Sequence, residues 1–172
     1  MAQRSHIETE DSQKAVAWLR ALLGDRLVAV VLYGSRARGD HRPESDWDLL
    51  VIASGLPEDR WERSRIFRVP PRPDIHPNLS LMTKTPEEFD RYLPAVYLDI
   101  ALDGKVLHDP TGYAAEGLSK LGRIIDKAGL YRERVPGAGF EWRWHDPPPI
   151  GKWAIEWDYL DRGEDPGESD AG

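Results

Sequence analysis

Two uninterrupted apolar segments stand close together in the first third of the chain. They run from Leu27 to Tyr33 and from Leu49 to Ile52, and every side chain within them is aliphatic or aromatic. Runs of about four to eight such residues are typical of strands that are buried on both faces. We therefore predict two central strands of a sheet, joined by a polar connection.

Apolar residues at helical spacing flank the two predicted strands. Residues 11–23 show this spacing, which predicts a helix that Asp11 or Ser12 caps and Gly24 ends. Further helices are predicted near residues 58–67, after Thr85-Pro86 with an interruption near Pro94, and after Pro110, and further strands at residues 78–84 and 105–108. This order of helices and strands indicates an α/β chain, α+β in detail.

The polar connection between the central strands ends in two acids, Asp46 and Asp48, on either side of Trp47. Side chains of a strand alternate between its faces, so the two carboxylates are predicted to point the same way and Trp47 the other. Two such carboxylates repel each other unless a cation lies between them, and hard oxygen ligands suit Mg²⁺ or Mn²⁺. Because Mg²⁺ usually completes its shell with water and substrate phosphates, the pair predicts half of a site whose other half is a nucleotide.

A glycine turn, Gly34-Ser35, directly follows the first strand. The missing side chain of Gly34 lets a phosphate approach the backbone, and the Ser35 hydroxyl can donate a hydrogen bond to a phosphate oxygen. A short helix is predicted next, whose N-terminal amides favour an anion and whose Arg36 and Arg38 add fixed positive charge. We therefore predict a nucleotide-binding set that consists of Gly34, Ser35, Arg36 and Arg38.

The stretch from Gly34 to Val51, GSRARGDHRPESDWDLLV, resembles the signature of the polymerase β-like nucleotidyltransferase superfamily, in particular its minimal, antitoxin-type branch in prokaryotes. An Asp-X-Asp pair or a Gly-Ser turn alone is usually a solvated feature, but the combination between two apolar strands is specific. The resemblance implies a nucleotidyltransferase fold with a small mixed sheet flanked by helices. It also implies that the glycine and serine hold a triphosphate, and that Asp46 and Asp48 are catalytic and bind divalent ions.

Members of this superfamily that catalyse usually carry a third carboxylate on the next strand, where it completes the metal cluster and helps to deprotonate the acceptor. The predicted strand at residues 78–84 contains no acid, and Ser80 falls near the expected position. Asp74, just before that strand, and the more distant Asp99 are alternatives. Because a serine is not a general base at neutral pH without help, the resemblance supports binding of a Mg-nucleotide more firmly than turnover.

Composition limits the function further. The 172 residues suffice for one solid core, and a chain without cysteine has no disulfide, thiolate metal site or thiol catalysis. The net charge of −7 argues against general nucleic-acid binding, which needs a basic surface. The polar N-terminus is unlike a signal peptide and no apolar run approaches the length of a membrane span, so we expect a cytoplasmic protein without membrane contact.

The C-terminal part of the chain is rich in tryptophan. The tryptophans on either side of its proline run are Trp142, Trp144, Trp153 and Trp157. They either pack back over the core for stability or form a platform for an acceptor or partner, and we favour packing. We predict three parts: a nucleotidyltransferase domain over residues 1–130, a packed Trp-rich arm over residues 131–160, and an acidic disordered tail over residues 161–172.

The leading hypothesis is an enzyme that transfers a nucleoside monophosphate, most simply AMP, from a Mg-bound NTP such as ATP to an acceptor. The resemblance implies a protein acceptor, namely a small helical toxin. One alternative is a catalytically silent nucleotide-binding antitoxin or sensor that works by masking its partner. Another is a small-molecule transferase, which is disfavoured because no acceptor domain is evident in the sequence.

Overall fold

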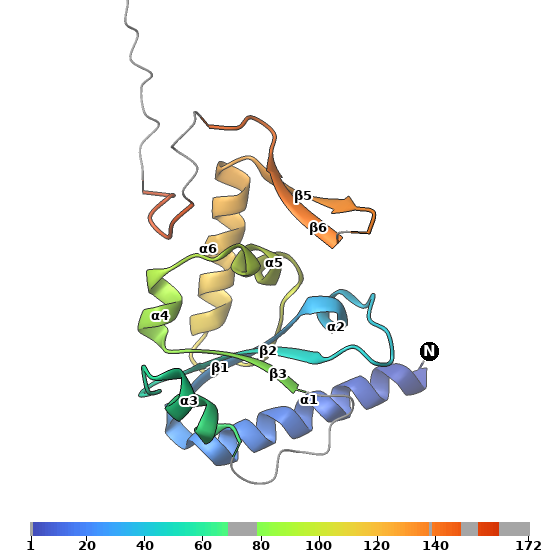
Figure 1. Ribbon diagram of the computed structural model, residues 1–172, viewed down its shortest axis with the longest axis vertical. Helices are drawn as coiled ribbons and strands as arrows, with labels where there is room; N and C mark the ends of the chain where they lie inside the picture. Colours follow the sequence, from blue (N-terminus) through green and yellow to red (C-terminus); the bar gives the residue numbers. More distant parts are fainter. Residues whose placement is uncertain (1, 69–78, 138, 149–154, 162–172) are drawn as a thin grey trace, which may run out of the picture.

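A four-stranded sheet forms the centre of the molecule, with helices on both faces (Figure 1). The computed structural model describes residues 2–68, 79–137, 139–148 and 155–161, with side chains from Glu10 onward. The strand order is β3-β2-β1-β4, and a separate two-stranded sheet, β5-β6, follows the last helix. The predicted fold class, a small mixed sheet flanked by helices, is confirmed.

The two apolar segments form the central strands β1 (Leu27–Tyr33) and β2 (Trp47–Ala53), which pair in antiparallel orientation. The edge strands are β4 (Lys105–His108), antiparallel to β1, and β3 (Leu79–Lys84), parallel to β2. Most side chains of β1 and β2 are buried because each strand lies between two others and between layers of helices.

The first helix, α1 (Ala2–Leu23), starts earlier than predicted. The predicted cap at Asp11 or Ser12 is wrong, because the helix runs through both positions. The residues before them contain neither proline nor glycine and include good helix formers, so nothing in the sequence stops the helix there. Gly24 ends α1 as predicted, with φ at +54°, and a short 3₁₀ helix, η1 (Gly24–Arg26), leads into β1.

The remaining helices lie in the regions predicted for them. Asp59 caps α3 by accepting hydrogen bonds from two backbone amides, and Thr85 and Glu88 form a complete capping box at the start of α4. Within the described residues, no helix combines the length and apolar character needed to cross a bilayer. The helix bounds are α2 (Gly34–Arg38), α3 (Arg60–Ile66), α4 (Pro86–Arg91), α5 (Ala95–Asp103) and α6 (Tyr113–Lys127).

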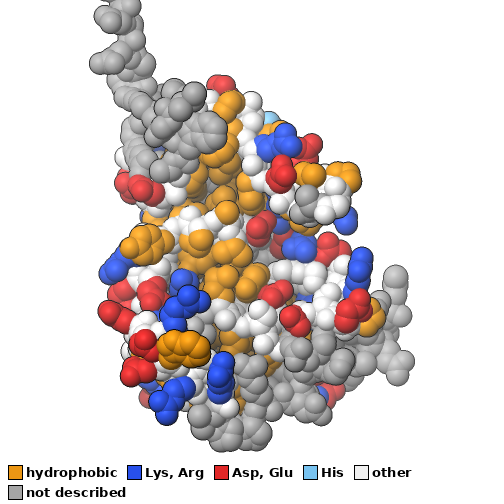
Figure 2. Space-filling model, viewed as in Figure 1, with side chains coloured by type: hydrophobic (Ala, Val, Ile, Leu, Met, Phe, Trp, Pro, Cys, Tyr) orange, Lys and Arg blue, Asp and Glu red, His pale blue; other side chains and the backbone are white. Residues whose placement is uncertain are grey.

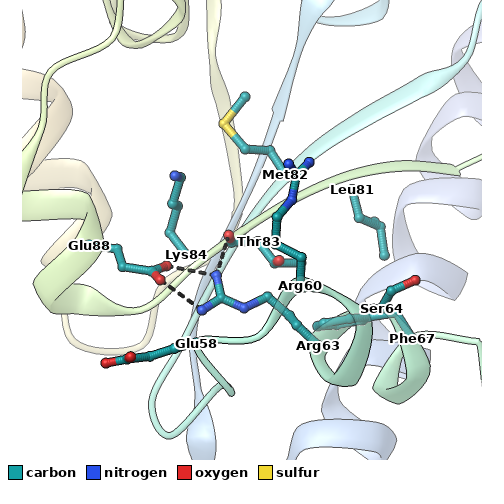
Figure 3. A pocket seen from close by; sticks show the side chains of 10 residues that line it. All are labelled: Glu58, Arg60, Arg63, Ser64, Phe67, Leu81, Met82, Thr83, Lys84 and Glu88. Carbon is teal, nitrogen blue, oxygen red and sulfur yellow. Dashed lines mark hydrogen bonds and ion pairs between the residues drawn. The ribbon is translucent and has the colours of Figure 1, made fainter.

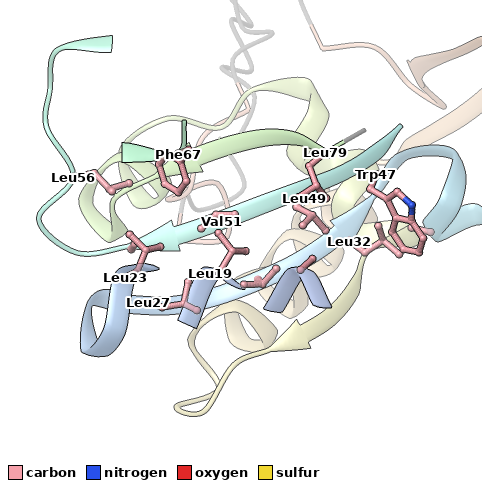
Figure 4. Close-up of a cluster of buried hydrophobic side chains, with 14 residues drawn as sticks. Leu19, Leu23, Leu27, Leu32, Trp47, Leu49, Val51, Leu56, Phe67 and Leu79 are labelled. Carbon is pink, nitrogen blue, oxygen red and sulfur yellow. The ribbon is translucent and has the colours of Figure 1, made fainter. Parts of the chain in front are cut away.

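Buried side chains hold three layers together. On one face of the sheet, α1 packs against β1 and β2 through a cluster that includes Leu19, Val51 and Phe67 (Figure 4). On the other face, α4, α5 and α6 pack against the same strands through a cluster that includes Leu50 and Tyr97. On the surface seen in Figure 2, positive and negative side chains are intermixed around a central apolar area.

Beyond α6 the chain forms a hairpin that the sequence pattern did not predict. β5 (Leu130–Val135) pairs in antiparallel orientation with β6 (Gly139–Trp144). Leu130, Trp142 and Trp144 belong to a cluster with α5 and α6 residues, so the hairpin rests on these two helices.

Another tryptophan, Trp157, packs beside the ring of Phe89 at the end of the described chain. Its Nε1 donates a hydrogen bond of 2.9 Å to the carbonyl oxygen of Phe89. Trp153 and the acidic tail after Asp161 lie outside the described residues. The division of the chain into three parts stays a prediction.

Candidate functional site

The acidic pair meets the glycine turn where β2 begins and β1 ends. Asp48 is the second residue of β2, opposite Tyr33 on β1 and Ser80 on β3. Leu50 packs toward α5 and α6, so Asp48 shares that face of the sheet. Trp47 is buried in the cluster on the α1 face, and the predicted alternation of the two side chains is observed.

The carboxyl group of Asp48 is half-buried, and its surroundings favour the protonated form. Burial raises its pKa above the ordinary value, and the nearby charge of Asp46 acts in the same direction. A hydrogen bond with Ser80 and the charges of Arg38 and Arg36 lower the pKa, without outweighing the other effects. A bound cation would compensate the negative charge at this point.

Gly34, the first residue of α2, lies directly against Asp48. Its φ of +72° is in the left-handed region that favours glycine. A Cβ atom at this position would collide with Oδ2 of Asp48 and lie 3.2 Å from its Cγ. The missing side chain was predicted to admit a phosphate, and the structure adds that it makes room for the Asp48 carboxylate.

Asp46 is exposed at the end of the loop between α2 and β2, and Arg36 holds this loop in place. The Arg36 Nε and Nη2 atoms donate hydrogen bonds of 3.0 and 2.8 Å to the carbonyl oxygen of Ser45. The guanidinium also lies 4.5 Å from the ring centre of Trp47, and Arg36 is only 8% exposed. We predicted that Arg36 binds the nucleotide, and this role stays a prediction; the contacts seen here hold the loop that carries Asp46.

Ser35 and Arg38 are the partly exposed polar residues of α2. The Arg38 Nε atom donates a 3.2 Å hydrogen bond to Oδ1 of Asp40, and its guanidinium lies 5.1 Å from the ring centre of Phe140 on β6. Its charge is close enough to Asp48 to lower the pKa of that carboxyl group. Of the two arginines, Arg38 is therefore the one that stands open to a phosphate.

Ser80, which we placed near the position expected for a third carboxylate, pairs with Asp48 in the register of β2 and β3. Asp99, one of the alternatives, accepts hydrogen bonds at its Oδ1 from Arg132 at 3.1 Å and from Trp142 at 3.2 Å. Asp74, the other alternative, lies outside the described residues. Across the described parts of the chain, no group of three or more His, Cys, Asp or Glu residues is arranged to hold a metal ion.

This donor set fits a magnesium ion that is shared with a nucleotide better than a metal held by protein alone. Asp46 and Asp48 offer two carboxylates, the number that Mg²⁺ usually takes from protein when phosphates and water complete its shell. The unfavourable charge at Asp48 is the observation that supports a cation there. Binding of a Mg-triphosphate is therefore what the arrangement can do chemically.

Two residues of this region escaped the sequence analysis, Tyr33 and Phe140. Burial, followed by the charge of Asp48, raises the pKa of Tyr33 to about 12, so its hydroxyl stays protonated. Its place directly before Gly34 was the available signal, but we counted it only as the last apolar residue of a strand. Phe140 lies far along the chain, and no local pattern connects it with Arg38.

A cavity of about 530 Å³ lies at the other end of the β2–β3 pair, between α3 and the end of β3 (Figure 3). Arg63 crosses it and donates two hydrogen bonds, of 2.8 and 2.7 Å, to the carboxylate of Glu88. Glu88 also accepts a 3.0 Å hydrogen bond from the amide of Thr85. None of the predicted site residues lines this cavity, and its central charges are paired with each other.

Solved structures that resemble this chain share little sequence with it. One, a toxin-antitoxin with AMP-PNP, is 17% identical with a TM-score of 0.46. The match covers 67% of this chain and 90% of the chain in that structure. Another is spectinomycin adenyltransferase AAD(9) from Enterococcus faecialis with ATP and spectinomycin. It is 15% identical with a TM-score of 0.44, and the match covers 69% of this chain and 65% of the chain in that structure.

The family described as "Polymerase beta, Nucleotidyltransferase" matches residues 22–68, which hold the glycine turn and both aspartates. The Methanocaldococcus jannaschii protein named "Putative protein adenylyltransferase MJ1305" is 49% identical over 45 residues, 26% of this chain and 31% of that protein. A second from the same organism, "Putative protein adenylyltransferase MJ0141", is 37% identical over 54 residues, 31% of this chain and 54% of that protein. This chain thus spans less than two thirds of the length of either relative.

Proposed function

Because the chain belongs to the polymerase β-like nucleotidyltransferase superfamily, we propose that it transfers a nucleoside monophosphate from a Mg-bound nucleoside triphosphate to an acceptor hydroxyl. The proposed donor is ATP, the transferred group is AMP and the acceptor is a protein. The names of the two Methanocaldococcus jannaschii relatives, each printed as "Putative protein adenylyltransferase", support this choice. We further propose that the acceptor is a small helical toxin, as the resemblance of the Gly34–Val51 stretch implies.

One observation carries the proposal: Gly34 packs against the carboxylate of Asp48. The turn that would receive phosphates and the acids that would hold a metal ion are thus in direct contact. Either feature alone has ordinary structural explanations, whereas their contact matches the needs of a metal-bound nucleotide.

In the proposed complex, Asp46 and Asp48 hold Mg²⁺, or Mn²⁺ in its place. The ion, when bound, neutralises the triphosphate and makes the α-phosphorus a better target for attack. The Ser35 hydroxyl donates to a phosphate oxygen, and Arg38 adds a positive charge that neutral pH does not remove. Arg36 acts indirectly, by holding the loop that presents Asp46.

During the proposed transfer, the acceptor oxygen forms a bond to the α-phosphorus while the bond from that phosphorus to the α,β-bridging oxygen breaks, and pyrophosphate leaves. The acceptor hydroxyl must also lose its proton. Ser80 lies opposite Asp48 on β3, the strand on which we expected a third carboxylate, so we propose that a water held by Ser80, or Asp74, takes this role.

The test is transfer of label from ATP that carries ³²P at the α-phosphate. The acceptors to try are a co-purified partner protein, RNA ends and the protein itself. We expect label on a protein acceptor, dependent on Mg²⁺ or Mn²⁺ and lost in Asp46→Asn and Asp48→Asn. Label at the γ-phosphate should not be transferred, and the exposed Asp126→Asn variant should behave like the wild type.

A catalytically silent nucleotide-binding antitoxin or sensor is the second candidate, because β3, the strand beside Asp48, contains no acidic residue and pairs Ser80 with Asp48. Both candidates predict that Mg²⁺ and ATP together stabilise the protein, by about 2.7 kcal/mol at a hundredfold excess over the dissociation constant. Stabilisation without transfer to any acceptor would favour the silent binder. Without either result, the nucleotide-binding proposal itself would be wrong.

A further inference from the structure

We propose that Phe140, on the C-terminal hairpin β5–β6, is a positioning residue of the nucleotide site: its ring holds the guanidinium of Arg38 in place for the triphosphate. The inference rests on the proposed function, because it assigns Arg38 to the phosphates. It makes the hairpin a functional wall of the site in addition to its packing role.

The contact joins two segments that are distant in sequence. The guanidinium carbon of Arg38 lies 5.1 Å from the ring centre of Phe140, within the range of a cation–π interaction. Arg38 needs such a support, because α2 has only five residues and ends at Gly39, whose φ is +83°. An arginine on so short a helix would otherwise lose much side-chain entropy when it binds a phosphate.

The ring also holds Arg38 without occupying its hydrogen-bond donors. Asp40 accepts from Nε, at 3.2 and 3.4 Å from its two oxygens. Neither terminal nitrogen of Arg38 has a hydrogen-bond partner among the described residues. An aromatic face attracts the cation but accepts no strong hydrogen bond from it, so the terminal N–H groups remain available for phosphate oxygens.

Phe140 can serve this purpose because the hairpin is firmly attached to α5. Arg132 on β5 forms ion pairs with Asp99 and Asp103, and the Nε1 atom of Trp142 donates a 3.2 Å hydrogen bond to Asp99. The Arg132 guanidinium also lies 4.5 Å from the Phe140 ring centre. Contacts within the hairpin therefore hold the Phe140 ring in place, and Arg38 contacts this ring from the proposed nucleotide site.

The interaction can be tested by a double-mutant cycle on the affinity for an ATP analogue that is not hydrolysed, measured by calorimetry with Mg²⁺. Phe140→Leu should raise the dissociation constant about two- to fivefold, and Phe140→Tyr, which keeps the ring, should restore it. In an Arg38→Gln background, Phe140→Leu should add no further loss. Arg143→Gln, an exposed change on the same hairpin, is the matched control and should leave the affinity unchanged.

The outcomes separate this inference from the proposed function. A wild-type protein that does not bind the Mg-nucleotide contradicts both. A wild type that binds, with Phe140→Leu unchanged or equally weakened in both backgrounds, contradicts only the role of Phe140 through Arg38. Melting curves check that each variant is folded, and Phe140→Met, which keeps apolar bulk without the ring, replaces Phe140→Leu if the latter does not fold.

Discussion

The acidic side chains at the two ends of the parallel strand pair β2–β3 have pKa values that shift in opposite directions. At the end where β2 begins, burial and the neighbouring Asp46 raise the pKa of Asp48. At the other end, the hydrogen bonds from Arg63 are the main reason why the pKa of Glu88 is lowered. We call the Asp48 end unmatched, because the charged form of this acid lowers the free energy of unfolding. We call the other end matched, because the ion pair of Glu88 with Arg63, together with the capping box, raises the free energy of unfolding. The contrast separates an end at which we propose that a metal-bound nucleotide binds from an end whose ion pair stabilises the fold.

The largest expected effect is at the unmatched end. Replacing both acids, Asp46→Asn with Asp48→Asn, removes the proposed metal ligands, so we expect transfer activity to fall by about 10²–10³ or more. Stability without metal should stay the same or rise, because an unfavourable charge is lost. Labelled-ATP transfer and thermal melting in EDTA measure the two quantities. A double variant that is active, or much less stable than the wild type, would contradict the assigned role.

The next effect concerns the contact between the turn and the acid. Gly34→Ala should lower the free energy of unfolding by about 2–4 kcal/mol, from the left-handed backbone and the collision with Asp48. Gly39→Ala is the matched control: its φ is +83°, but no atom lies within 4 Å of the added Cβ, so about 1–2 kcal/mol is expected. Urea unfolding gives both values. In an Asp48→Ala background the two substitutions should cost the same, and a persisting difference would exclude the carboxylate as its cause.

At the matched end, the expected effect is on stability alone. Glu88→Gln weakens the pair with Arg63 and the capping box, which should cost about 1–2 kcal/mol and lower Tm by about 3–6 °C. Glu133→Gln removes an ion pair with Arg143 whose side chains are 48% and 50% exposed, so a smaller loss, below about 1 kcal/mol, is expected. Calorimetric melting at neutral pH compares them. Equal losses would show that burial and capping add nothing to the Arg63–Glu88 pair.

The smallest expected effect is on the pH dependence of stability. As pH rises, the contribution of Glu88 should increase and that of Asp48 should decrease. The pKa of Glu88 is lowered on folding, so its contribution is present at neutral pH and fades as pH falls through that lowered value. The pKa of Asp48 is raised, so the wild type should lose stability relative to Asp48→Asn as pH rises above about 4. Thermal melting of the wild type, Asp48→Asn and Glu88→Gln from pH 3 to 7 in EDTA tests both signs. A parallel course of wild type and Asp48→Asn would remove the evidence for unmatched charge.

Sequence patterns predicted the parts of this molecule whose causes are local. The apolar runs of β1 and β2 determine central strands by themselves, and Thr85-Pro86 starts a helix through contacts within one turn. The approach of Gly34 to the acidic pair could be predicted because a single connection joins the two strands. The missed start of α1 has a local cause too, since a capping residue inside a helix is indistinguishable from one at its start when the preceding residues also favour helix.

The features that sequence did not predict depend on contacts between distant segments. The alternation of Phe140, Trp142 and Trp144 was compatible with a strand, but its partner β5 is too polar to show a pattern. The attachment of that hairpin through Arg132 and Asp99 links residues 33 apart, for which no spacing rule exists.

The contact between Gly34 and Asp48 also limits how this chain can evolve. The two positions share one small volume, so a Cβ atom at position 34 collides with the Asp48 carboxylate where it now lies. A lineage that keeps the acid loses stability if it replaces the glycine. A lineage that has lost the acid no longer has that collision, and only the backbone preference at φ +72° still favours glycine. Paired substitution at these two positions would therefore mark, in genome sequences alone, descendants that have abandoned the chemistry while retaining the fold.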